Sequence, residues 1–281
     1  MLKFPAKKTL NCSKEDLQKS KLQISKHLLE KRWILPITNL CNKSCGGCNE
    51  LCGHFPKEKL WHLSLETIEE YIVLVKNYKE EFTIIGGEPT LHPQWEKVLD
   101  LLYYHPEINF RVNTNGRLGH VPFEVPDRGQ RNVKYFVDTH PEGQTFFPGM
   151  VAAQDVFKVE ERKFYWEKAK NDCPIWATEG ASIYKDKAYF CENAAAFDWL
   201  FHNGENGWNI EPGKNPFSRT AEEVAKQAEM FCYRCGWCAF NELDREKQQV
   251  HDSTLVTETN YKDFPKTRLL KLVMVDEVRK S

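Results

Sequence analysis

The chain has 281 residues, of which 41% are hydrophobic and 28% are charged. Its 39 basic and 40 acidic residues nearly cancel, so no dominant electrostatic attraction to nucleic acid is expected. The first residues lack the apolar core of a secretory signal, and no stretch approaches the ~20 apolar residues of a membrane-spanning helix. We therefore expect a cytoplasmic protein that is not bound to a membrane, with one large domain and an extension.

The first elements predicted along the chain alternate between helix and strand. Apolar residues spaced among charges over 14–31 predict a surface helix, and the apolar run 33–40 predicts the first strand. Ser64 is a suitable N-cap for a helix whose apolar residues recur at helical spacing. Residues 82–85 are predicted to form the second strand, and Pro93 to open another helix.

Further strands are predicted at 109–112, 134–137 and 156–159. Strands that alternate with helices indicate a parallel sheet. The predicted fold is therefore α/β, a partial (β/α)6 barrel whose site lies at the carboxyl ends of the strands. We place this barrel and its N-terminal helix in residues 1–165, and a small C-terminal extension in residues 166–281.

Three of the ten cysteines, Cys41, Cys45 and Cys48, lie at the end of the first predicted strand. In a reducing compartment this number of cysteines favours metal ligation over disulfides. Three thiolates are one short of the four that an iron–sulfur cluster normally takes, so one iron would stay open to another molecule. A zinc site is the alternative, with Cys52 or His54 as the fourth ligand.

The second predicted strand runs directly into Gly86-Gly87-Glu88-Pro89. Paired glycines at the end of an apolar strand indicate a backbone that must approach a ligand closely. A zinc site has no use for such a segment. The glycine pair therefore favours the iron–sulfur interpretation of the three cysteines.

Together the cysteine triad and this glycine-rich strand end resemble the radical S-adenosylmethionine (SAM) superfamily. The resemblance implies that Cys41, Cys45 and Cys48 hold a [4Fe-4S] cluster whose open iron binds the amino and carboxylate groups of SAM. It implies that Gly86, Gly87 and Glu88 form a further part of the SAM site. Reductive cleavage of SAM would then give a 5′-deoxyadenosyl radical, while the protein positions the substrate.

Four more residues are candidate SAM contacts by the same resemblance. The family usually has an aromatic residue just before the third cysteine, near the adenine; here Gly47 stands there, so adenine contacts come from backbone or from elsewhere. Asn113 and Asn115 belong to an Asn-Thr-Asn-Gly segment similar to a strand-end motif of the family. Asp138 lies where relatives often place a polar residue near the ribose or carboxylate of SAM. Ordinary turn chemistry is the alternative for these three polar residues.

The second half of the chain contains five more cysteines. Cys173 and Cys191 flank a predicted hairpin. Thr220 and Glu223 form a capping box for a helix that leads into the cysteine-rich segment 232–238. Four of these five cysteines would suffice for a second metal site.

This half resembles the Twitch extension, the short form of the SPASM domain found in many radical SAM enzymes. The resemblance implies an auxiliary [4Fe-4S] cluster with the ligands Cys173, Cys191, Cys232 and Cys235. Cys238 departs from the pattern: it either replaces one ligand, remains a buried thiol, or donates a hydrogen atom to a substrate radical. Cys52, four residues beyond Cys48, is a second candidate hydrogen donor. Zinc remains the alternative for this site as well.

The resemblance implies a radical SAM oxidoreductase or isomerase that uses SAM, two clusters and an external electron donor such as flavodoxin or ferredoxin. The compact chain also resembles the aminocyclitol dehydrogenase of butirosin biosynthesis. That likeness implies oxidation or epimerisation of a small polar substrate of sugar, aminocyclitol or nucleotide type. The alternatives are a maturase that modifies a ribosomal peptide or a nucleic-acid base, and a non-catalytic module stapled by metal.

Overall fold

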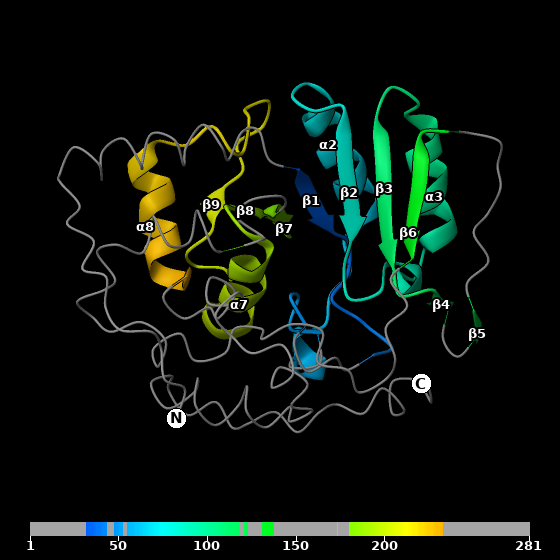
Figure 1. Ribbon diagram of the computed structural model, residues 1–281, viewed down its shortest axis with the longest axis horizontal. Helices are drawn as coiled ribbons and strands as arrows, with labels where there is room; N and C mark the ends of the chain where they lie inside the picture. The colour runs from blue at the N-terminus through cyan, green and yellow to red at the C-terminus, as the bar shows by residue number, and fades with distance from the viewer. Residues whose placement is uncertain are drawn as a thin grey trace.

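The computed structural model describes residues 32–43, 48–52, 55–118, 121–122, 131–137, 173 and 180–232. Within these residues the chain forms a seven-stranded sheet (Figure 1). In spatial order its strands are β6 (Val133–Val137), β3 (Asn109–Thr114), β2 (Glu81–Ile85), β1 (Trp33–Pro36), β7 (Ala181–Tyr184), β8 (Lys187–Tyr189) and β9 (Trp208–Asn209). The five strands from β6 to β7 run parallel, and β8 pairs antiparallel with both of its neighbours, β7 and β9. The predicted α/β class with a parallel-rich sheet is therefore confirmed.

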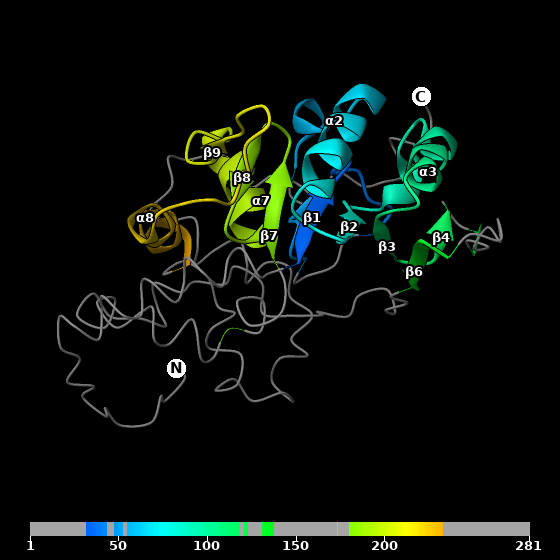
Figure 2. The ribbon, with the colours of Figure 1, turned by 90° about the horizontal axis from the view of Figure 1, so that it is seen from above.

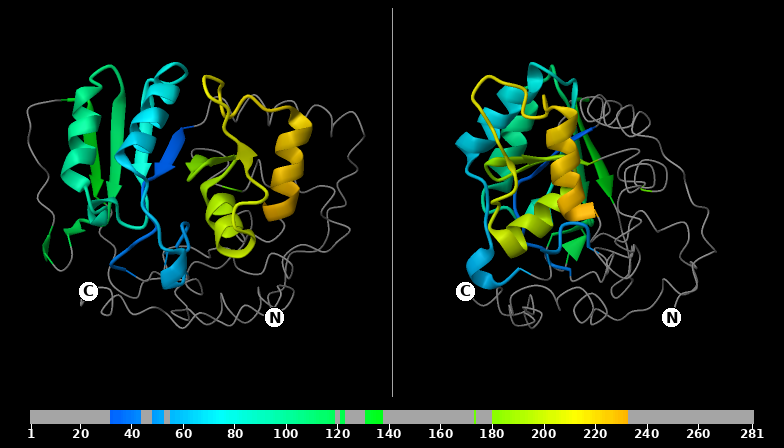
Figure 3. Two further views of the ribbon diagram at one scale, coloured as in Figure 1. Left: turned by 180° about the vertical axis from the view of Figure 1, so that it is seen from behind. Right: turned by 90° about the vertical axis from the view of Figure 1, so that its left-hand side faces the viewer.

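Helices α2 (Leu65–Lys76) and α3 (Trp95–Tyr104) lie on the same side of the parallel strands (Figure 3, left). Helix α2 begins where the sequence predicts, because the Ser64 hydroxyl accepts a hydrogen bond from the Thr67 amide. Helix α3 begins at Trp95, so Pro93 lies just ahead of the helix and outside its first turn. Both helices bury the apolar stripes that predicted them.

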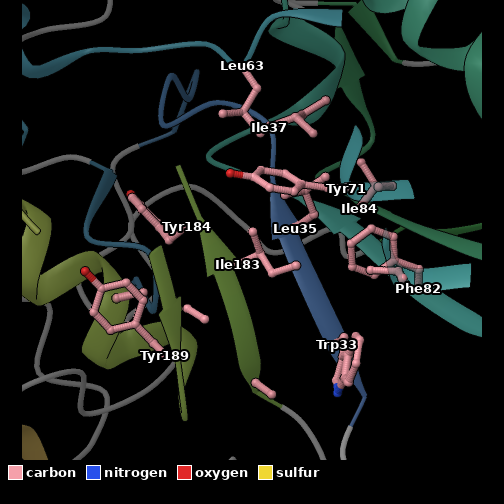
Figure 4. Close-up of a cluster of buried hydrophobic side chains, with 14 of the residues drawn as sticks. Trp33, Leu35, Ile37, Leu63, Tyr71, Phe82, Ile84, Ile183, Tyr184 and Tyr189 are labelled. Carbon is pink, nitrogen blue, oxygen red and sulfur yellow. The ribbon is translucent and has the colours of Figure 1, made fainter. Parts of the chain in front are cut away.

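The core between the sheet and α2 is built from matching positions on neighbouring strands. The β1–β2 register pairs Trp33 with Phe82 and Leu35 with Ile84, and all four side chains are buried. Figure 4 shows Leu35 and Ile84 near Tyr71 of α2, with Trp33 at the other end of β1. Burial of side chains of this size stabilises the fold by roughly 2–3 kcal/mol each. This packing holds the end of β1 in a fixed place.

The predicted hairpin between Cys173 and Cys191 is confirmed as β7 and β8, with Lys185 in a left-handed conformation at the turn. The position of this hairpin in the sheet was not predicted. Strand β7 pairs in parallel with β1, with Ala181 opposite Trp33, so the sheet continues into the predicted C-terminal extension. Figure 2 shows β7 next to β1, with β8 on the other side of β7.

Within the described residues, two helices follow the hairpin. Helix α7 (Glu192–His202), which the sequence analysis did not predict, packs against β7, β8 and α8 (Ala221–Cys232). The capping box of α8 is confirmed: the Thr220 amide donates to Glu223 Oε2 at 2.8 Å, and the Glu223 amide donates to Thr220 Oγ1 at 3.2 Å. This helix therefore carries the chain to the cysteine-rich segment, as predicted.

The remaining elements differ from the predictions in extent or, like β4 (Arg117–Leu118), β5 (Val121–Pro122) and β9, were not predicted. Strand β1 ends at Pro36 and is shorter than predicted, whereas β3 continues to Thr114. A separate ribbon pairs β4 with β5. The predicted helix 14–31 and the predicted strand 156–159 lie outside the described residues. Among the helices that the structure describes, none has the length and apolar character to cross a membrane.

Candidate functional site

The segments that follow β1, β2 and β3 meet at the carboxyl edge of the sheet. In Figure 1 the arrowheads of these strands point toward the blue segment that follows β1. Backbone hydrogen bonds continue beyond the strands: the Gly87 amide donates to Thr38 O at 2.9 Å, and the Glu88 amide donates to Leu40 O at 2.8 Å. The chain that leads to Cys41 is therefore held against the end of β2.

The glycine pair is required by this close approach. A Cβ atom on Gly86 would lie 2.4 Å from Thr38 O, and one on Gly87 would lie 2.3 Å from Leu40 O and 2.8 Å from Cys41 Cβ. The sequence predicts a close approach to a ligand. In the described residues the close approach is to the chain itself, which the glycines allow to lie directly beside the first cysteine.

Glu88 joins the ends of β2 and β3. Its side chain is fully buried. Its Oε1 accepts hydrogen bonds from the Thr90 amide and hydroxyl and from the Thr114 hydroxyl, at 3.1, 2.7 and 2.7 Å. Its Oε2 accepts from the Asn115 amide at 2.7 Å. The carboxylate thus faces protein donors and fixes the backbone of Asn115.

Asn115 in turn contacts the cysteine segment. Its Nδ2 donates to Asn42 Oδ1 at 2.7 Å and lies 4.0 Å from Cys41 Sγ. The Lys43 amide also donates to Cys41 Sγ, at 3.4 Å. Hydrogen bonds to ligand sulfurs are one of the factors that set the potential of an iron–sulfur cluster. Cys41 is therefore oriented by side-chain and backbone donors at the edge of the sheet.

Asn113 has different surroundings, although the sequence analysis treated it together with Asn115. It lies within β3, and its Oδ1 accepts from Arg111 Nε at 2.8 Å. The Arg111 guanidinium lies 4.1 Å from the centre of the Phe136 ring, and Phe136 is the β6 residue paired with Asn113. Asn113 thus contacts a neighbour on its own strand, whereas Asn115 reaches the segment of Cys41.

Cys48 and Cys52 interact with one another. A hydrogen bond from the Cys52 thiol is the main cause that lowers the pKa of Cys48 to about 7. The same bond, followed by burial, raises the pKa of Cys52 well above its usual value. Because metals bind the thiolate, Cys48 suits a ligand, whereas Cys52 is a buried, protonated thiol.

Two acidic residues lie beyond Cys48. Glu50 and Glu192 are both buried, and burial followed by the charge of Glu192 raises the pKa of Glu50 well above its usual value. Asn49 Nδ2 donates to Glu192 Oε1 at 3.1 Å. The loop after the first cysteine group therefore contacts the first turn of α7, which begins directly after Cys191.

Two cysteines of the second half lie at the ends of helices. Cys191 is the N-cap residue of α7, and Cys232 is the last residue of α8. Both are half-buried and pack against the core, as does Cys173. Cys235 and Cys238 lie outside the described residues.

Neither predicted set of ligands is complete in the described part of the chain. The undescribed members at the first site are Cys45, Gly47 and Asp138. Among the residues that are described, no group of three or more Cys, His, Asp or Glu side chains could hold a metal ion.

Several residues of this edge were missed by the sequence analysis. Thr114 and Asn42 lie inside segments already singled out, so their neighbours were an available signal. Asn49 and Glu192 are 143 positions apart, and nothing in a single sequence pairs them.

Comparison with known proteins gives one family. Residues 35–138 match the family model described as "Radical SAM superfamily". A solved structure, the crystal structure of Streptococcus suis SuiB bound to precursor peptide SuiA, matches with 21% identity and a TM-score of 0.26. The match covers 42% of this chain and only 27% of that chain. No curated protein sequence matches the chain. The segment that matches the radical SAM superfamily therefore contains the last two residues of β1 and all of β2, β3 and β6.

Proposed function

We propose that the protein is a radical SAM enzyme with two [4Fe-4S] clusters that abstracts hydrogen from a small polar substrate of sugar, aminocyclitol or nucleotide type. The outcome would be oxidation or epimerisation. One observation supports this proposal above the others: the ends of three parallel strands converge on Cys41 through Gly87, Glu88 and Asn115. The carboxyl ends of parallel strands are where α/β folds place their sites.

The residues present fit the first cluster and SAM. Cys41 and Cys48 offer thiols on either side of Cys45, and Cys41 Sγ already faces nitrogen donors. When bound, the cluster and SAM supply the 5′-deoxyadenosyl radical that attacks the substrate. In our proposal Gly86, Gly87 and Glu88 place the backbone next to the cofactor; the further proposed contacts are Gly47, Asn113, Asn115 and Asp138.

The second cluster is proposed for the C-terminal extension, with Cys173, Cys191, Cys232 and Cys235 as ligands. The proximity of Cys191 to the loop after Cys48 supports this arrangement, because it brings both cysteine groups to one region. A flavodoxin or ferredoxin would deliver electrons. Cys52 and Cys238 are the proposed candidates for returning a hydrogen atom to a substrate radical.

Metal content is the first test. The chain is reconstituted anaerobically with iron and sulfide, and iron and zinc are counted. Two four-iron clusters predict about eight irons per chain. Bound zinc without iron would overturn the proposal.

Cleavage of SAM is the second test. We expect the reduced, reconstituted chain to produce 5′-deoxyadenosine, and Cys45→Ala to abolish this activity with the loss of about four irons. Cys12→Ala is the matched control, since Cys12 belongs to neither predicted ligand set and should leave both measurements unchanged. Undiminished turnover in Cys45→Ala would contradict the assignment of the first cluster.

The fate of the hydrogen separates the two reaction types. Stoichiometric consumption of SAM without uptake of solvent hydrogen indicates oxidation. Deuterium from D2O in the product indicates epimerisation. In the second case Cys52→Ala or Cys238→Ala should stop the turnover while 5′-deoxyadenosine still forms.

A further inference from the structure

A hydrogen bond links the two cysteine regions of the chain. Asn49 Nδ2 donates to Glu192 Oε1 at 3.1 Å. Asn49 follows Cys48 directly, and Glu192 follows Cys191 directly. One side-chain hydrogen bond therefore lies between a proposed ligand of the first cluster and a proposed ligand of the second.

The surroundings of this hydrogen bond are buried. Glu50 is 6% exposed and Glu192 is 5% exposed, and the Tyr184 side chain of β7 is fully buried. Glu50 Oε1 has no hydrogen-bond partner among the described residues. Burial is the main cause that raises the pKa of Tyr184 well above its usual value. Asn49 is half-buried, so the acceptor side of this hydrogen bond is shielded from water while the donor side is partly open to it. A buried acceptor that loses its donor is costly, which favours the bonded arrangement.

The α7 side of the contact is rigid. Glu192 is the first residue of α7, where the exposed amides of the helix N-terminus favour a negative side chain. Helix α7 packs against β7 and β8, and β7 pairs with β1. The acceptor is thus fixed to the same sheet that positions Cys41.

We propose that the hydrogen bond between Asn49 and Glu192 is a brace that fixes Cys48 relative to Cys191, and thereby sets the separation of the two clusters. This inference rests on the proposed function. Asn49 and Glu192 act as positioning residues, because they hold the chain next to a ligand without binding the metal.

The test measures the magnetic coupling between the two reduced clusters by pulsed electron paramagnetic resonance on the reconstituted full chain. Asn49→Ala and Glu192→Ala should shift or broaden the coupling. Glu192→Gln should preserve it, because the amide oxygen can still accept from Asn49. Asn209→Ala is the matched control, since it removes an exposed side-chain hydrogen bond to Lys187 on the edge of the sheet.

A second measurement needs no cluster. In the cluster-free chain, hydrogen exchange at residues 48–52 and 191–196 should rise together in Asn49→Ala and in Glu192→Ala. The double variant should exceed neither single variant, because each already removes the shared contact. The iron content per chain is a further readout. The brace is also supported if Asn49→Ala and Glu192→Ala bind less iron than the wild-type chain while Glu192→Gln and Asn209→Ala bind the same amount.

The outcomes separate the brace from the proposed function. Wild-type coupling in both alanine variants overturns the brace and leaves the two-cluster enzyme standing. A wild-type chain that binds fewer than two clusters overturns the proposed function. Hydrogen exchange then decides whether the contact exists, and unchanged exchange in both segments overturns the brace.

Discussion

Glu88 is a buried carboxylate that accepts four hydrogen bonds, from Thr90, Thr114 and Asn115. A buried acceptor with several donors is costly to remove, because each donor then loses its partner away from water. Its side chain holds Asn115, and Asn115 contacts the segment of Cys41. Glu88 therefore affects both the stability of the fold and the position of Cys41, a proposed ligand of the first cluster.

Glu88→Ala should lower the free energy of unfolding by about 3 kcal/mol, because it leaves buried donors without an acceptor. Glu88→Gln keeps one oxygen and places an amide group against a donor, so about half that loss is expected. Urea unfolding of the cluster-free chain measures both values. A change below about 0.5 kcal/mol in Glu88→Ala would show that the network is not formed in solution.

Gly87→Ala should displace the segment that carries Cys41. The new Cβ would lie 2.3 Å from Leu40 O, so the backbone must move, at a cost of about 2 kcal/mol. We also expect the first cluster to bind less iron. The control is Gly213→Ala: its Cβ would have no atom within 4 Å, but its φ of +73° is unfavourable for alanine. Gly213→Ala should lower the free energy of unfolding by about 1 kcal/mol without loss of bound iron. If Gly87→Ala and Gly213→Ala bind the same amount of iron, the proposed steric displacement of Cys41 is contradicted.

At the scale of elements, helix α8 begins with a complete capping box. The hydrogen bond from the Thr220 amide is the main cause that lowers the pKa of Glu223 below its usual value. A lowered pKa in the folded state means that the ionised carboxylate stabilises the fold. This contribution is present at neutral pH and is lost as the pH falls through the pKa of the folded state.

Two substitutions separate the halves of the capping box. Thr220→Ala removes the hydroxyl acceptor and should lower stability by about 1 kcal/mol at neutral pH. Most of the acid dependence should remain, because the residue-220 amide, the main cause of the lowered pKa of Glu223, still donates to its carboxylate. Glu223→Gln should remove that part of the acid dependence, because the group no longer titrates. Thermal unfolding between neutral and acidic pH measures both. A wild-type pH profile in Glu223→Gln would argue against the role of the carboxylate.

Helices α2 and α7 differ in how well the local sequence predicts them. The start of α2 was predictable because a serine N-cap precedes an apolar stripe, and both signals lie within one short segment. Helix α7 begins with a cysteine N-cap that makes no side-chain cap bond, and nearly all of its first turns are buried. Because α7 is buried on nearly every side, it lacks the one-sided apolar stripe by which periodicity predicts a surface helix.

At the scale of the whole molecule, the sheet crosses the predicted boundary between residues 165 and 166. Strand β7 supplies hydrogen-bond partners for β1, and Trp33 and Ala181 lie opposite one another in the buried sheet. An unpaired edge at β1 would expose backbone groups and apolar side chains. The two predicted units, residues 1–165 and 166–281, therefore share one sheet, although a different cluster is proposed for each.

Residues 1–165 alone should therefore fail to form a stable fold. We expect aggregation or weak circular dichroism, because β1 would lose its β7 partner. Co-expression with a separate 166–281 fragment should restore soluble protein by supplying β7 in trans. A soluble, cooperatively unfolding 1–165 fragment would contradict this expectation and make the boundary a folding boundary.

The sequence by itself determined the local features: the parallel strand–helix pattern, the α2 cap, the hairpin, the capping box and the cysteine segments. Each rests on residues close together in the chain, whose preferences act over a few positions. Only the tertiary structure decided which of these meet. Asn115 leaves the end of β3 and reaches Asn42, whereas Asn113 stays within the sheet, and Asn49 meets Glu192 across 143 positions. Strand order and burial fix such contacts, because they depend on which strands become neighbours, and no short segment carries that information.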